Sequence, residues 1–319
     1  MAEKTISQIV NGIAPISHET AGKLELVTGV PASFWNRRES SYREGLARRE
    51  EKKKLAGETE WLKQIPVKVL IERGFVEGGQ YRSNPVRSIL AFFGVSSVEA
   101  WRNAWEKPVC VQFRGGEAQE RRPGYVAAWL RMGEIQAEQI ECKPFDAAAF
   151  RKVLSKAREM TLARDREWPK ELRTLCAAAG VCFVMTKEIP TASVSGATRW
   201  LTKDKALLQL SLKYKKNDQF WFSFFHEAGH ILLHGKRQVF VEFSNSDDTK
   251  EEREADRFAR DILIPPTYTH HLPGLKFAKE IERFAAVIGI DPGIVVGRLQ
   301  RDGILKRAFC NNLKRTYKW

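Results

Sequence analysis

One stretch of the chain constrains the fold more than any other. Residues 219–235, QFWFSFFHEAGHILLHG, are apolar on nearly every helical face, yet they include His226, Glu227 and His230. A helix that is apolar all round lies buried in the centre of a domain. Burying three polar side chains without partners would cost several kcal/mol. The sequence therefore predicts a central helix, ended by Gly235, that carries a satisfied polar site.

The spacing of these polar residues is that of an HExxH motif. Four residues along a helix separate the two imidazoles by about one turn on the same face, so both can bind one tetrahedral zinc ion. From its place beside the first histidine, Glu227 can accept a proton from a zinc-bound water, whose pKa falls to about 7. We interpret His226 and His230 as ligands of one Zn²⁺ per chain and Glu227 as the catalytic general base. Manganese and iron stay open as alternatives.

A third ligand is required, and the next predicted helix, from about residue 247 to 265, offers carboxylates. Glu252 and Asp256 share a face at i and i+4, so one can bind zinc while the other accepts the free N–H of a ligand histidine. We favour Glu252 as the metal ligand. Glu254 points elsewhere and is expected to be solvated or ion-paired. His234 is expected to stabilise the helix C-terminus, since three histidines at i, i+4 and i+8 span about 12 Å.

Taken together, these segments resemble the ImmA/IrrE family of bacterial metallo-endopeptidases. The resemblance lies in HEAGHILLHG, EEREADRFARDILIP and the preceding SGATRWL and LLQLSLKYKKNDQFWFSFF, over about residues 172–267. A weaker similarity follows in IGIDPGIVVGRLQRDGIL. The resemblance implies that Glu252 is the third zinc ligand and that Asp256 is the acid four residues later in the same motif. It also implies a cytoplasmic regulatory protein, often a repressor, as substrate.

The N-terminal residues 4–36 resemble the helix-turn-helix domain of the XRE/HigA antitoxin type. We expect one helix over 4–12 and another from His18 to about Thr28, capped by Ser17. In that fold a recognition helix lies in the DNA major groove. The resemblance gives this role to residues 4–12, with a polar, DNA-contacting face of Lys4, Thr5, Ser7 and Gln8. Two helices normally precede the recognition helix, so roughly 20–30 further residues are expected upstream of Met1.

The remaining pattern gives an α+β fold that is mainly α. Short strands are expected at 181–186, 193–201 and 208–212, making a small three-stranded sheet. The last reads as half-buried because leucines alternate with polar residues. In the second, Gly196 indicates a bulge or a close backbone approach. Asn217 or Asp218 is expected to cap the central helix, and Asp291 with Pro292 starts a helix that runs to Gly303.

The expected organisation has five parts. They are a partial helix-turn-helix at 1–40, a charged linker helix at 41–60, a helical region at 61–165, a zinc metallopeptidase domain at 166–285 and a helical C-terminal segment at 286–319. Within the helical region, Trp101, Trp105 and Trp129 are expected to be ordinary core residues.

Composition limits the class of protein. The first 30 residues contain no long apolar run behind a basic start, so we expect no secretory signal, and no apolar run approaches the ~18 residues of a membrane span. The five scattered cysteines fit a reduced cytoplasm. A net charge of +14 favours an acidic partner such as DNA, although a solvated basic face gives the same charge. The sequence leaves the oligomeric state open, with a homodimer as one possibility because helix-turn-helix proteins often dimerise.

Two functions follow. The first is a zinc endopeptidase that cleaves a repressor-like protein and is fused to a DNA-binding module, with substrate extended along an edge strand. Tyr268, His270 and His271 are weaker candidates for oxyanion stabilisation. The second is a non-enzymatic transcriptional regulator or antitoxin with a structural or sensory metal. The variant Glu227→Gln separates them, since a non-catalytic site has no use for that carboxylate.

Overall fold

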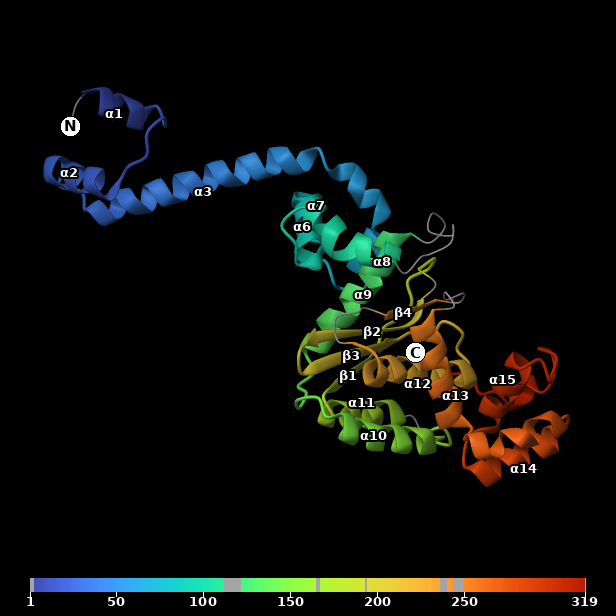
Figure 1. Cartoon of the computed structure of the whole chain (residues 1–319). Helices are drawn as coiled ribbons and strands as arrows, with labels where there is room; N and C mark the ends of the chain where they lie inside the picture. The colour runs from blue at the N-terminus through green and yellow to red at the C-terminus, as the bar shows by residue number, and fades with distance from the viewer. Residues whose placement is uncertain are drawn as a thin grey trace. The chain divides into compact units, whose positions relative to one another are not determined.

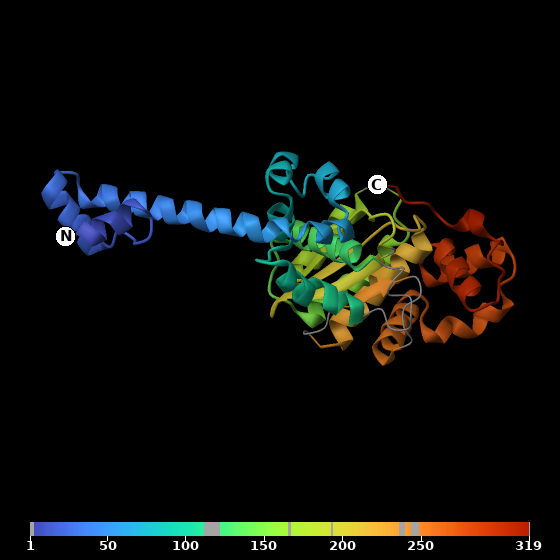
Figure 2. The same ribbon diagram turned by 90° about the horizontal axis from the view of Figure 1, so that it is seen from above.

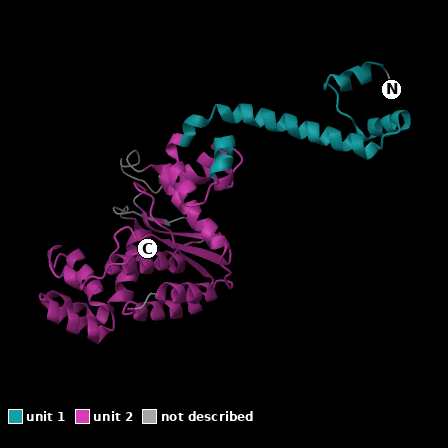
Figure 3. Ribbon diagram, turned by 180° about the vertical axis from the view of Figure 1, so that it is seen from behind, with its two compact units in different colours: residues 1–62, 78–88 teal, residues 63–77, 89–319 magenta. Residues whose placement is uncertain are grey.

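The computed structural model describes residues 3–111, 122–164, 167–192, 194–235, 240–243 and 249–318. The chain divides into two compact units, which Figure 3 shows in different colours. Unit 1 comprises residues 1–62 and 78–88, and unit 2 comprises residues 63–77 and 89–319. In the part of the chain that the structure describes, no helix is long and apolar enough to cross a membrane.

Unit 1 contains the helices α1 (Glu3–Val10), α2 (His18–Thr28), α3 (Ala32–Ala56) and α5 (Gly78–Ser83). The predicted cap of α2 is confirmed, since the hydroxyl oxygen of Ser17 accepts a hydrogen bond from the backbone N–H of Thr20 at 3.2 Å. The third helix runs unbroken from Ala32 to Ala56 and so covers most of the linker helix expected at 41–60, because residues 32–56 contain no proline. Among the described residues of α1 and α2, only Ala21 is buried.

The described residues between 59 and 160 are mostly helical. Its elements are η1 (Thr59–Gln64), α4 (Val67–Glu72), α6 (Pro85–Phe93), α7 (Val98–Trp101), the π-helical turn η2 (Arg102–Glu106), α8 (Lys107–Val111), α9 (Pro123–Glu138) and α10 (Ala147–Met160). Trp101, Trp105 and Trp129 are all buried, which confirms their expected place in the core.

A small mixed sheet lies at the centre of unit 2 (Figure 1). The three expected strands are β1 (Val181–Met185), β2 (Val194–Thr202) and β3 (Lys205–Leu210), and a fourth, β4 (Phe240–Phe243), extends the sheet. The strand order is β1-β3-β2-β4; β1 runs parallel to β3, and β2 runs antiparallel to both β3 and β4. The predicted class, α+β and mainly α, is therefore confirmed.

Helices cover both faces of this sheet, as the view in Figure 2 shows. On one face, Phe183 and Leu208 belong to the large core that includes the apolar residues of α12 (Asn217–Leu233). On the other face, α9 approaches so closely that the Gln209 amide donates to the backbone oxygen of Trp129 at 2.8 Å. The expectation of a half-buried β3 is therefore wrong. Its alternating polar residue is buried too, because α9 supplies the hydrogen bond that Gln209 needs.

The C-terminal half completes the core around α12. It consists of α11 (Trp168–Ala178) before the sheet and of α13 (Lys250–Leu263), η4 (Pro266–Gly274), α14 (Ala278–Ile288), α15 (Pro292–Arg301) and η5 (Asn311–Leu313) after it. The helix start at Asp291 is confirmed, since its carboxylate accepts the N–H of Gly293 at 2.9 Å.

Candidate metal centre

The site is built where α12 and α13 pack against each other. Gly229 lies at this contact, and a β-carbon there would lie 3.2 Å from the Cα of Ala255. The missing side chain lets the two helices come close together. Thr249 fixes the start of α13 by accepting the N–H of Glu252 at 3.2 Å. The first turn of α13 is therefore held beside the middle of α12.

This packing brings together the three residues that the sequence analysis named as metal ligands. The Nε2 atoms of His226 and His230 are 3.0 Å apart. Glu252 places Oε2 3.1 Å from Nε2 of His226 and Oε1 3.3 Å from Nε2 of His230. Ligands at about 2.0–2.1 Å from a tetrahedral zinc ion are separated by about 3.3–3.4 Å. The donor set and its spacing thus fit one zinc-sized ion, and no other cluster of this kind is found among the described residues.

The protonation states of two of these groups also suit a metal. Burial lowers the pKa of His230 to about 4, so its imidazole is neutral at pH 7. Burial opposes ionisation of Glu252, but hydrogen bonds from His226 and His230 outweigh it and lower the pKa to about 2. A metal binds neutral imidazole and ionised carboxylate, which are the forms that these two groups take at neutral pH.

Asp256 lies where the i, i+4 spacing predicted. Its Oδ1 accepts from Nδ1 of His226 at 3.0 Å, which leaves the Nε2 of that ring for a metal. Its Oδ2 receives a hydrogen bond from Arg301 of α15 at 2.5 Å, and that guanidinium also lies 4.6 Å from the ring centre of Phe222. Burial opposes ionisation, yet the hydrogen bond with His226 and the charge of Arg301 hold the pKa of Asp256 below its usual range. No spacing in the sequence indicated the contribution of Arg301.

His234 and Glu254 form a further contact beside the ligands. His234 follows α12 as its C-cap residue, and its ring lies 2.9 Å from His230 through their Nδ1 atoms. Glu254 places Oε2 3.2 Å from Nε2 of His234 and Oε1 3.7 Å from Nζ of Lys250. Glu254 is thus ion-paired, as expected, whereas its contact with His234 was not predictable from the spacing of the two residues.

Glu227 points from α12 towards strand β2. Its side chain is fully buried, and its Oε2 accepts a hydrogen bond from the hydroxyl of Thr198 at 2.5 Å. A β-carbon at Gly196 would lie 2.6 Å from Oε1 of Glu227, so only glycine leaves room for this carboxylate. The strand pairing also shifts register between Val194 and Gly196. Gly196 therefore shows both expected features, an irregular strand pairing and a close approach, here by Glu227. Thr198 lies two residues further along the same strand.

The N-terminus of α12 is held in a different way from the one predicted. Asn217 and Asp218 do not cap it, since the N-cap position is Lys216 and has no side-chain cap hydrogen bond. Instead, the buried Asn217 amide donates to Asp291 at 2.6 Å, and Asp218 pairs with Lys314 at 2.6 Å. Both side chains therefore bind partners at the contact of α12 with the start of α15 and the C-terminal segment.

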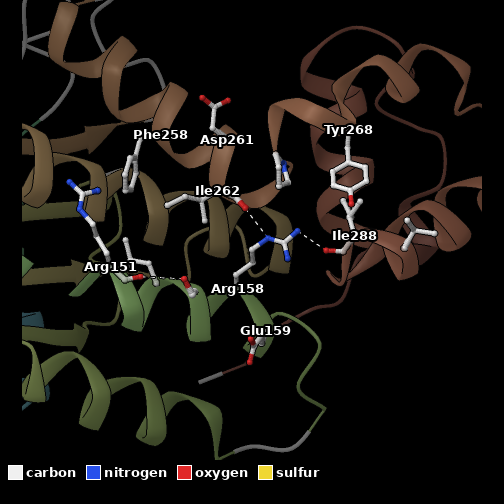
Figure 4. A pocket seen from close by; sticks show the side chains of 12 residues that line it. Arg151, Arg158, Glu159, Phe258, Asp261, Ile262, Tyr268 and Ile288 are labelled. Carbon is white, nitrogen blue, oxygen red and sulfur yellow. Dashed lines mark hydrogen bonds between the residues drawn. The ribbon is translucent and has the colours of Figure 1, made fainter. Parts of the chain in front are cut away.

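A separate hollow lies elsewhere on unit 2. It measures about 670 Å³ and is lined by residues of α10, α13, η4 and α14 (Figure 4). There Arg158 donates to the backbone oxygens of Ile262 and Ile288. Tyr268 lines the same hollow, with its ring 6.4 Å from that of Phe284, and His270 stacks on His271. The residues lining it include none of the proposed metal ligands, so we do not assign the hollow to the metal centre.

In unit 1, the residues expected to contact DNA share α1. Lys4 and Ser7 are exposed, and Thr5 and Gln8 are partly exposed.

Comparison with known proteins supports one part of the family resemblance. Residues 184–299 match the Peptidase_M78 family, described as the IrrE N-terminal-like domain. This region contains all of α12 and α13, and with them the whole histidine and carboxylate cluster. The match indicates a peptidase-type function, and the family is typically metal-dependent. No curated protein matches the chain.

Proposed function

We propose that the protein is a zinc-dependent endopeptidase. The observation that carries the proposal is the convergence of His226, His230 and Glu252 to mutual distances of 3.0–3.3 Å, next to a buried glutamate, inside a region that matches a peptidase family. These three residues would hold the metal. Glu227 would be the catalytic base, and Asp256 would orient His226.

A bound zinc ion would supply a water molecule of pKa about 7 and polarise the scissile carbonyl. The chain's own residues do the rest. Glu227 accepts a proton from the attacking water and passes it to the leaving amine. The hydroxyl of Thr198 holds that carboxylate by a hydrogen bond, and Gly196 leaves room for it because it has no side chain. The carboxylate therefore needs little reorganisation during proton transfer.

The substrate is proposed to be a repressor-like regulatory protein, on the basis of the family resemblance. We propose that it binds as an extended segment beside β4. This strand is at one edge of the sheet and pairs with β2, the strand that supplies Gly196 and Thr198 to the site. An edge strand offers backbone N–H and C=O groups to which an extended peptide can add.

The test compares wild-type protein with Glu227→Gln on a library of peptides made from a bacterial proteome. New N-termini are identified by mass spectrometry, and zinc content is measured for both proteins. We expect discrete cleavage by the wild type and a loss of ~10²–10⁴-fold in the variant, with zinc retained. Absence of new N-termini, or equal cleavage by the variant, would favour the non-enzymatic regulator.

We propose in addition that unit 1 binds DNA. The support is the helix-turn-helix resemblance of residues 4–36, the exposed polar residues Lys4 and Ser7 on α1, and the excess of basic over acidic residues on α3. Binding to a duplex library is expected to weaken with salt and to weaken further in Lys4→Gln. Equal binding by wild type and variant at every salt concentration would refute the role of Lys4.

A further inference from the structure

We infer that His234 and Glu254 form a positioning relay that fixes the tautomer and orientation of the metal ligand His230. The inference rests on the proposed metal centre and extends it by two residues with no assigned role. Neither residue would touch the metal or the substrate.

The contacts of the His230 ring point in two opposite directions. Its Nε2 faces the cluster, at 3.0 Å from Nε2 of His226 and 3.3 Å from Oε1 of Glu252. Its Nδ1, on the other edge of the ring, lies 2.9 Å from Nδ1 of His234. His234 is therefore behind the ligand ring and cannot join the same coordination sphere.

When His230 binds a metal, the hydrogen bonds from His230 through His234 to Glu254 allow only one placement of the ring protons. A metal on Nε2 leaves the proton of the neutral ring on Nδ1, so His230 donates to Nδ1 of His234. His234 can accept there only if its own proton is on Nε2. That N–H faces Oε2 of Glu254 at 3.2 Å, and the carboxylate can only accept. The carboxylate of Glu254 thus favours the His234 tautomer that can accept from His230, and with it the His230 tautomer whose Nε2 is free for a metal.

The two ligand histidines are consequently oriented by two carboxylates of the same helix, by different routes. Asp256 accepts directly from Nδ1 of His226 at 3.0 Å. For His230, the interposed ring of His234 spans the gap to Glu254. The side chain of His234 is only 5% exposed, so water does not easily replace it as the acceptor. Partners of this kind typically change metal affinity by about 10–100-fold.

The experiment measures zinc affinity of the purified full chain by competition with a chromogenic chelator, using four variants. His234→Phe keeps a ring but removes the acceptor, whereas His234→Gln retains an acceptor. Glu254→Leu removes the terminal carboxylate from an exposed position, so it leaves folding intact. Glu251→Leu removes the same charge from the same helical turn and is the matched control. Thermal unfolding of each metal-free protein reports on folding.

We expect His234→Phe to weaken zinc binding by about 10–100-fold and Glu254→Leu to weaken it by a smaller factor. His234→Gln should recover most of the affinity, and Glu251→Leu should match the wild type. Wild-type affinity in both His234→Phe and Glu254→Leu overturns the relay. So does equal weakening in His234→Gln and His234→Phe, or in Glu251→Leu and Glu254→Leu. Each of these outcomes overturns only the relay, and the proposed function stands as long as the wild type binds one zinc. A wild type that binds no zinc overturns both the relay and the proposed metal centre.

Discussion

Replacing Gly229 by alanine tests how the contact of α12 with α13 sets the geometry of the metal centre. The new β-carbon would lie 3.2 Å from the Cα of Ala255 and 3.2 Å from Cδ1 of Phe258. Carbon atoms in favourable contact are about 3.5–4.0 Å apart. The helices must therefore separate by roughly 0.3–0.8 Å, and Glu252 moves away from both histidines with α13.

Two opposing effects decide the outcome for stability. Alanine in a helix interior is favoured over glycine by roughly 0.5–1 kcal/mol, and mild overpacking costs about 1–3 kcal/mol. Because the backbone contact is only slightly too short, we expect the metal-free protein to lose at most about 2 kcal/mol. Metal sites tolerate displacements of about 0.2 Å, so zinc affinity should fall by about tenfold, or ~1.4 kcal/mol.

The assay is chelator competition for zinc, with thermal unfolding of the metal-free protein measured in parallel. Gly22→Ala is the control, since it is also a helical glycine and a β-carbon there meets nothing within 4 Å. Its zinc affinity should equal that of the wild type. If Gly229→Ala folds and binds zinc as tightly as the wild type, the close approach of the helices does not set the ligand geometry.

Two further predictions concern single side chains. Gly196→Ala would place a β-carbon 2.6 Å from Oε1 of Glu227, so we expect about 10²-fold slower peptide cleavage with zinc content unchanged; cleavage at the wild-type rate contradicts this account of the base. The hydrogen bond with Cys182 lowers the pKa of the Cys142 thiol to about 7, against the opposing effect of burial. Alkylation of Cys142 by iodoacetamide, followed by site-specific mass spectrometry, should rise with pH to a midpoint near 7. Cys176 is fully buried, and burial raises its pKa, so it should stay unmodified. A midpoint near pH 9 for Cys142 would refute the lowered pKa.

The sequence predicted the parts of the site that depend on local spacing. HExxH places two imidazoles on one helical face whatever the surroundings, and Glu252 with Asp256 shares a face for the same reason. The structure brings both pairs together. Gly196 was recognisable as a close approach because a glycine inside a strand pattern usually has a steric reason.

Contacts between distant segments were not predictable in this way. Arg301 reaches Asp256 from a helix 45 residues later, and only the packing of α15 decides that. The burial of Gln209 depends on α9, about 80 residues earlier in the chain. Likewise, Asn217 looked like a helix cap, but the neighbouring Asp291 offered a buried partner and tertiary structure overrode the local preference.

The three-ligand metal centre is tested most directly by the zinc bound per chain, measured by elemental analysis in the wild type and in Glu252→Ala. We predict about one zinc per wild-type chain and its loss in the variant, because removing the carboxylate leaves only two protein ligands. A wild type that holds no metal after zinc is supplied, or a variant that keeps its full complement, would contradict the assignment of His226, His230 and Glu252 as the metal centre.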